Sequence, residues 1–189
     1  MENRYMGVSS LSWAQYLMED VEVTPKKSGT FSLSSGQSIT LEEGKKTTIK
    51  RWAARELAEF LEVHEEALSP KEVALSAWKE ENDARNLKKI DPLFYSRASD
   101  SMTRGGEKEL RASISELLSV RKRKIMEAAV TGRDDAEFYD SMTAEERKFY
   151  DDLKRCVDGW QEFLVLVLSG ISPIEGGGKV GREATANRR

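Results

Sequence analysis

The clearest pattern in the chain is a series of apolar residues at helical spacing near its C-terminal end. Successive apolar side chains are separated there by four, three, four, three and four positions, at Phe149, Leu153, Cys156, Trp160, Phe163 and Val167. This spacing places them on one side of a helix, and Tyr150, Val157 and Leu164 widen the stripe. Thr143 and Glu146 form the capping-box pattern that begins a helix. A stripe this wide needs more than one neighbouring element to cover it.

Further helices are predicted before this one. One starts near Pro70, because Ser69 and Glu72 match a capping box and Pro70 suits the first helical position. The dipeptide at 91–92, Asp-Pro, opens another helix. A longer helix carries apolar residues on one side, interrupted by a single arginine, at Leu110, Ile114, Leu117, Arg121, Ile125 and Ala128.

The first third of the chain has a different pattern. A short helix is expected over residues 9–18, and three short segments then alternate apolar and polar side chains between glycine-containing turns, at residues 21–23, 30–33 and 38–41. Helical spacing returns from Ile49 to Leu61. We therefore expect a small antiparallel sheet whose open face is closed by a helix.

Together these elements predict a mainly α-helical protein in three parts. Residues 1–66 form a small β-rich domain closed by a helix, and residues 67–168 form a five-helix-type α-helical assembly domain. Residues 169–189 include three consecutive glycines within a polar, aperiodic sequence, which predicts a flexible, disordered tail.

Composition narrows the possible classes of protein. The 189 residues carry a net charge of −3, with 39% hydrophobic and 33% charged residues, which predicts a modest core under a highly charged surface. The longest apolar run, residues 163–168, is far shorter than the roughly 20 residues that cross a bilayer. A soluble intracellular protein is therefore expected. A single cysteine and a single histidine exclude an internal disulfide and a Cys/His zinc cluster.

No group of residues matches a catalytic, cofactor or metal site. His64 has no nucleophile near it in the sequence, and Cys156 lies on the apolar stripe, where a thiol is usually an inert, small hydrophobic side chain. The glycines before Lys179 do not form a phosphate-binding loop, because Pro173 and Val180 occupy positions that require Gly and Ser or Thr. We therefore expect a protein that is not an enzyme and that needs no cofactor.

The basic run at residues 121–124 has two possible roles. Four consecutive helical residues fan through about 300°, so at least one, Arg121, must lie on the apolar side of its helix and needs a carboxylate partner. Ion pairing by Arg121, Arg123 and Lys124 with an acidic helix or a second subunit is favoured over contact with DNA phosphates, because neither half of the chain is strongly basic. Trp52 and Leu57 are expected where the two domains meet.

The apolar stripe of the last helix exceeds what a polar bundle can cover. We expect the excess to form an interface with other subunits. The residues assigned to this interface are Phe149, Tyr150, Leu153, Val157, Trp160, Phe163 and Leu164.

Four segments, in this order, resemble landmarks of GINS replication-complex subunits. The helix around Trp52 to Leu57 is similar to the one that closes the β-rich domain of the family. The other three resemble landmarks of its helical domain, and they are residues 91–95, 118–125 and 143–150. The resemblance covers about residues 8–168. The order of the domains is similar to that of the archaeal subunit related to the second and third eukaryotic members.

This resemblance implies a role that the residues alone do not show. The helical domain of the chain would pack with those of further copies or of a related subunit to form a tetramer. This tetramer would bridge the MCM helicase and a RecJ/Cdc45-like protein in DNA replication. It also implies an archaeal, cytoplasmic protein near the nucleoid, with at most weak or indirect DNA contact. The alternative is a helical, dimerising, DNA-associated regulator whose residues 121–124 touch phosphates.

Overall fold

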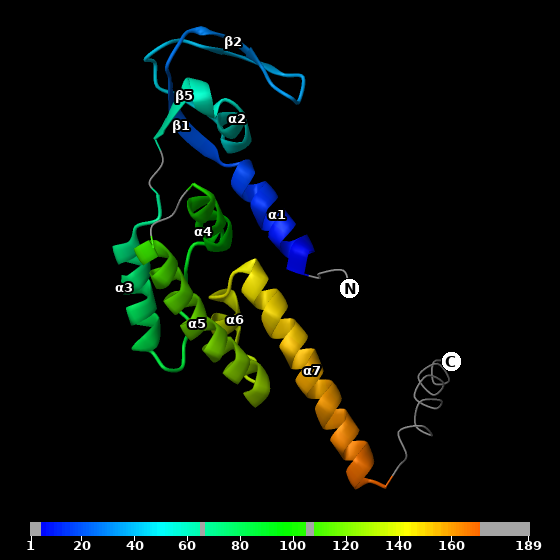
Figure 1. Ribbon diagram of the computed structural model, residues 1–189. Helices are drawn as coiled ribbons and strands as arrows, with labels where there is room; N and C mark the ends of the chain where they lie inside the picture. Colours follow the sequence, from blue (N-terminus) through cyan, green and yellow to red (C-terminus); the bar gives the residue numbers. More distant parts are fainter. Residues whose placement is uncertain (1–4, 65–66, 105–107, 171–189) are drawn as a thin grey trace, which may run out of the picture.

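The computed structural model describes residues 5–64, 67–104 and 108–170. It confirms a mainly helical protein with a small antiparallel β domain at its N-terminal end and a helical domain after it (Figure 1). The tail predicted to be disordered lies outside the described residues beyond Gly170. None of the helices in the described ranges is both long and apolar enough to cross a membrane.

The β domain contains two small antiparallel sheets. Strands β4, β1 and β5 form one sheet in that order, and β2 and β3 form a hairpin. In the first sheet Val21 lies opposite Ile49 and Val23 lies opposite Val63, which gathers these side chains on one face. The strands are β1 (Asp20–Pro25), β2 (Gly29–Ser32), β3 (Ser38–Leu41), β4 (Thr47–Lys50) and β5 (Leu61–His64).

Two of these strands were not predicted, because each is four residues long and lies within helical spacing. The helix expected from Ile49 to Leu61 is instead the end of β4, helix α2 (Arg51–Glu56), the 3-10 turn η1 (Ala58–Phe60) and the start of β5. Ile49 and Leu61 are both buried, but they contribute to the core from strands. Helix α2 closes the sheet with Ala53 and Ala54, as expected of a helix in this position, and Leu57 directly after it joins the same core.

Helix α1 (Tyr5–Leu17) confirms the short helix expected at the N-terminus. It packs against α4 and α7 of the helical domain as well as against α2 (Figure 1). Tyr16, near its C-terminal end, is only 1% exposed. Helix α1 therefore joins the two parts of the molecule, although it precedes the β domain in the sequence.

The helical domain has five helices in the described chain. Helix α3 packs along α5, and α5 in turn packs against α7 (Figure 1). The short helix α6 was not predicted; the Asp135 side chain caps it by accepting a hydrogen bond from the Phe138 amide at 2.7 Å. The helices are α3 (Pro70–Glu81), α4 (Phe94–Thr103), α5 (Lys108–Thr131), α6 (Ala136–Asp140) and α7 (Ala144–Leu168).

The two predicted capping boxes have different outcomes. At α7 the box is confirmed, because the Glu146 amide donates to Thr143 Oγ1 and the Thr143 amide donates to Glu146 Oε2. At α3 it is wrong, because Ser69 precedes the helix but its side chain makes no capping hydrogen bond. Pro70 does occupy the start of α3. The helix expected from residue 92 begins at Phe94, after a turn in which Asp91 Oδ1 accepts from the Leu93 amide.

This difference leads to a matched pair of predictions. We expect Thr143→Ala to lower the free energy of unfolding by about 1 kcal/mol, because it removes the acceptor for the Glu146 amide. Ser69→Ala should change it by less than about 0.5 kcal/mol. Urea unfolding followed by circular dichroism measures both values, and equal losses in the two variants would contradict the assigned caps.

Candidate subunit interface

A buried ionic cluster anchors the N-terminal half of α7 to α3 and α5. Arg121 of α5 is fully buried; its Nε donates to Glu146 Oε1 and its Nη2 to Glu146 Oε2, both at 2.7 Å. Its Nη1 also bonds the carboxylate of Glu80 on α3. Lys124 pairs with the same Glu80 and donates to the Asn86 carbonyl at 2.7 Å. Three helices are thus joined through one guanidinium.

Electrostatics favour the charged form of Arg121. Burial by itself would lower the pKa of Arg121, but the hydrogen bonds and charge of Glu146, followed by those of Glu80, outweigh it and raise the pKa. Burial, together with the charge of Glu146, raises the pKa of Tyr95, whose hydroxyl donates to Glu146 Oε1 at 3.3 Å. Each carboxylate of the cluster has a cationic partner, which is the condition under which buried charges are tolerated.

The apolar stripe of α7 changes its surroundings along the helix. Near the N-terminal end, Tyr150 is 4% exposed in a core cluster that also contains Ile125 and Phe138, and Phe149 and Leu153 pack against that cluster. Further along, Trp160 is 59% exposed, and Phe163 and Leu164 are each 39% exposed. The same stripe therefore begins in the core and ends in solvent.

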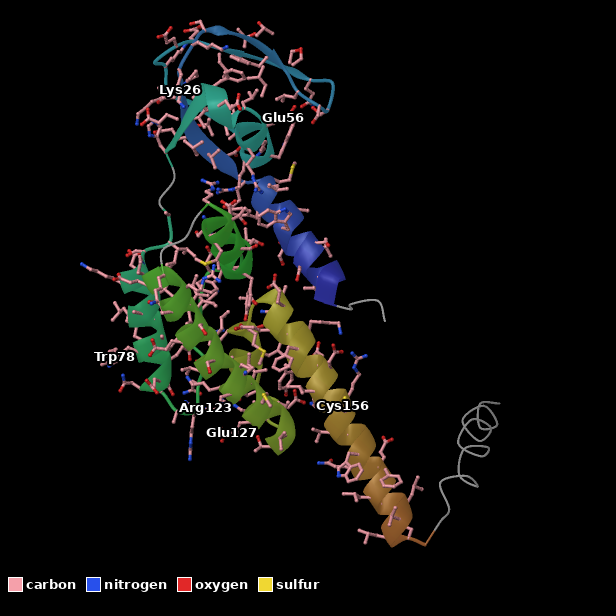
Figure 2. All side chains as sticks on the ribbon, in the orientation of Figure 1. Lys26, Glu56, Trp78, Arg123, Glu127 and Cys156 are labelled. Atoms are coloured by element: carbon pink, nitrogen blue, oxygen red, sulfur yellow. The ribbon has the colours of Figure 1, made fainter. Side chains whose placement is uncertain are left out.

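Helix length accounts for this change. Glu146 lies beside Arg121, after which α5 continues for ten residues and α7 for 22. At 1.5 Å per residue, α7 extends about 15–20 Å past the end of α5. Figure 1 shows α7 leaving the bundle, and beyond Cys156 its side chains stand away from the other helices (Figure 2). We call residues 156–168 the projecting end of α7.

A second polar cluster holds the β domain on the helical domain. The Tyr16 hydroxyl donates to Asp100 Oδ2 of α4 at 2.8 Å and accepts from Arg51 Nη1 of α2 at 3.0 Å. Glu19, which follows α1, accepts from Arg97 of α4 at 2.9 Å and from Arg51 at 3.1 Å. The domain junction is therefore made by α1, α2 and α4 through buried and half-buried charges.

Comparison with known families identifies the helical domain. Residues 67–162, slightly more than half of the chain, match the family model described as the GINS complex protein helical bundle domain, Sld5. The chain belongs to this family. It is a GINS complex subunit and therefore a component of a replication complex. GINS subunits are structural components of that complex. No curated protein matches the chain.

In this GINS subunit the seven residues assigned to the interface fall into two groups. Tyr150 is buried within the chain, and Phe149, Leu153 and Val157 are half-buried. Trp160, Phe163 and Leu164 are exposed on the projecting end, where the rings of Trp160 and Phe163 lie 5.4 Å apart. Only the second group offers a large free apolar surface.

The structure also gives the positions of other residues singled out in the sequence. Leu57 is in the core of the β domain, and Trp52 packs against that core. The neighbouring Arg51 donates to the Tyr16 hydroxyl of α1, and Arg55 pairs with Asp100 of α4. Cys156 is exposed rather than buried, because α7 leaves the bundle there.

The basic run at residues 121–124 is divided between the core and the surface. Arg121 and Lys124 are buried in the ionic cluster, whereas Lys122 and Arg123 are exposed. In Figure 2, Arg123 lies on α5, away from the α7 residue Cys156.

The only histidine is also accounted for. His64 Nε2 lies 2.7 Å from Thr24 Oγ1 on the neighbouring strand. Within the described ranges, no three His, Cys, Asp or Glu side chains are grouped to hold a metal ion.

The sequence gives little indication of two residues that complete these clusters. Glu80 is one of several acidic residues in a polar stretch, and Asp100 follows a serine in a short helix. Helical spacing is the one available signal that Glu80 is buried. Glu80 lies three residues after Ala77 and seven after Val73, so it shares the face of α3 on which both of these residues are buried.

Proposed function

We propose that this chain is a non-enzymatic subunit of a GINS-type tetramer and that the projecting end of α7 packs against another subunit. The observation that carries the proposal is the continuous apolar stripe, which is buried at Tyr150 and 59% exposed at Trp160. An exposed stripe of aromatic and aliphatic side chains costs free energy in water until a partner covers it. The partner is a second copy or a related GINS subunit.

The proposed complex bridges the replicative MCM helicase and a RecJ/Cdc45-like protein. The support for this step is the family membership of residues 67–162 together with the order of the domains, with the β domain first. That order is the arrangement of the archaeal-type subunit that the sequence resembles. In such a complex the chain contributes surfaces and contributes no catalytic group.

The test is the native mass and composition of the tagged full chain purified from its own cells. We expect a particle of four subunits, either four times 21.4 kDa or a mixture with a related helical subunit, together with helicase components. A lone 21.4 kDa chain without these partners would contradict the proposal.

The alternative of a DNA-associated regulator makes a different prediction. Only Lys122 and Arg123 of the basic run are exposed and available to phosphates. We expect Lys122→Ala/Arg123→Ala to leave the affinity for a fluorescent 20-base-pair duplex unchanged at each salt concentration tested. A clear loss of salt-sensitive binding, with the native mass unchanged, would favour the regulator.

A further inference from the structure

A hollow lies at the junction of the two domains and has no role in the assembly proposed above. Its volume is about 310 Å³. This is near the lower end of the range for small-ligand sites, which suits one or two side chains of a peptide. Its apolar lining comes from the sheet, from α2 and from the residues that follow α2, at Val21, Ala54, Ala58 and Val63.

All of the charged residues that line this hollow are arginines: Arg51, Arg55 and Arg104. Asp100 lies close by and is shared, because Arg55 Nη2 is 3.5 Å from its Oδ1 and Arg104 Nη2 is 2.7 Å from its Oδ2. The side chain of Asp100 is only 5% exposed, whereas those of Arg55 and Arg104 are 37% and 48% exposed. Two accessible guanidinium groups therefore share one buried carboxylate.

Further arginines lie at the same junction. Arg51 and Arg97 share Glu19, and Arg97 also pairs with Asp91. The guanidinium groups of Arg55 and Arg104 are exposed enough to bind the carboxylates of a ligand as well.

The sheet offers a backbone contact beside the hollow. Strand β5 is at one edge of the β4-β1-β5 sheet, and within the described residues no strand pairs with its outer side. Val63 of β5 is also part of the apolar lining. An extended peptide paired with β5 would direct alternate side chains toward the face that carries Val63.

We infer that this junction binds an extended acidic peptide segment of a partner protein, which adds to β5, places one apolar side chain in the hollow and sets its carboxylates against Arg55 and Arg104. The ligand contacts residues of the β domain together with Arg104, the residue that follows α4. Its binding therefore holds the two domains in their present arrangement.

The test uses the full-length chain and three fluorescein-labelled octapeptides, with binding measured by anisotropy. In the first peptide leucine alternates with aspartate or glutamate; in the second the leucines become serine; in the third the acids become lysine. We expect saturable binding of the first peptide alone, weakened by added salt. Binding of the serine or lysine peptide with equal affinity, or no binding of the first, would overturn the inference.

Two variants locate the binding. Arg55→Gln/Arg104→Gln should weaken the first peptide about fivefold to tenfold, because two half-exposed charge contacts are lost. Ala58→Phe leaves the charge of the protein unchanged. It should fill the hollow and remove detectable binding of the first peptide. Lys122→Gln/Arg123→Gln on α5 removes the same net charge elsewhere and should leave the affinity unchanged. Unaltered binding by both junction variants would overturn the inference.

The outcome is separable from that of the proposed assembly. Thermal unfolding and native mass are recorded for each variant, and we expect the junction variants to keep the wild-type mass. If the chain does not assemble but binds the first peptide as described, the assembly proposal fails and the peptide site stands. If the chain assembles but does not bind the first peptide, the assembly proposal stands and the peptide site fails.

Discussion

Replacing Arg121 with methionine should lower the free energy of unfolding by about 3–5 kcal/mol. The guanidinium of Arg121 lies between Glu146 and Glu80, and all three side chains are buried. Methionine fills part of the volume but leaves Glu146 as an uncompensated charge in the interior. The N-terminal end of α7, which begins at this cluster, should loosen with it.

Urea unfolding measures this loss, and Arg123→Met is the matched control. Arg123 is on the same helix and exposed, so its replacement should change the free energy of unfolding by less than about 0.5 kcal/mol. A second variant, Arg121→Met/Glu146→Gln, removes the stranded charge and should recover part of the loss. Similar stabilities of Arg121→Met and Arg123→Met would show that the cluster does not stabilise the fold.

A charge placed on the projecting end should separate subunits without unfolding them. We expect Trp160→Glu/Phe163→Glu to reduce the particle to single 21.4 kDa chains that keep their thermal stability. Both side chains are already exposed in the isolated chain, so the bundle loses little from their replacement. At an interface, in contrast, a central aromatic residue contributes about 2 kcal/mol or more, which is roughly a 30-fold change in affinity.

Val165 provides the matched control for this experiment. It is 62% exposed on the same part of α7 but lies about 140° around the helix from Trp160. Val165→Glu should therefore keep the native mass, as measured by light scattering. Equal dissociation by both variants would mean that α7 is sensitive to any charge, and assembly that withstands Trp160→Glu/Phe163→Glu would place the interface elsewhere.

Periodicity was a good guide to the helices and a poor one to their surroundings. The steps through Leu153 and Trp160 correctly predicted one helix with one apolar stripe. Which part of that stripe is covered depends on where α5 ends, at Thr131, relative to the start of α7. The spacing of residues within α7 contains no information about the length of its neighbour.

The same limit applies to polar residues. Arg121 could be found because a charge interrupts an apolar pattern, and its need for a carboxylate follows from burial. Glu80 could not be chosen among the many acidic residues, since its burial is decided by the packing of α3 along α5. Strand β5 was missed because four residues are too few to distinguish a strand from the end of a helix.

The projecting end also affects the amount of this chain in the cell relative to its partner subunits. A chain made in excess of its partners leaves Val167 and Leu168 in water, 51% and 86% exposed, at the tip of a long helix. Such a surface is open to chaperones, proteases and self-association. We expect unassembled copies to be short-lived, so that the amount of this protein follows the amount of its partners.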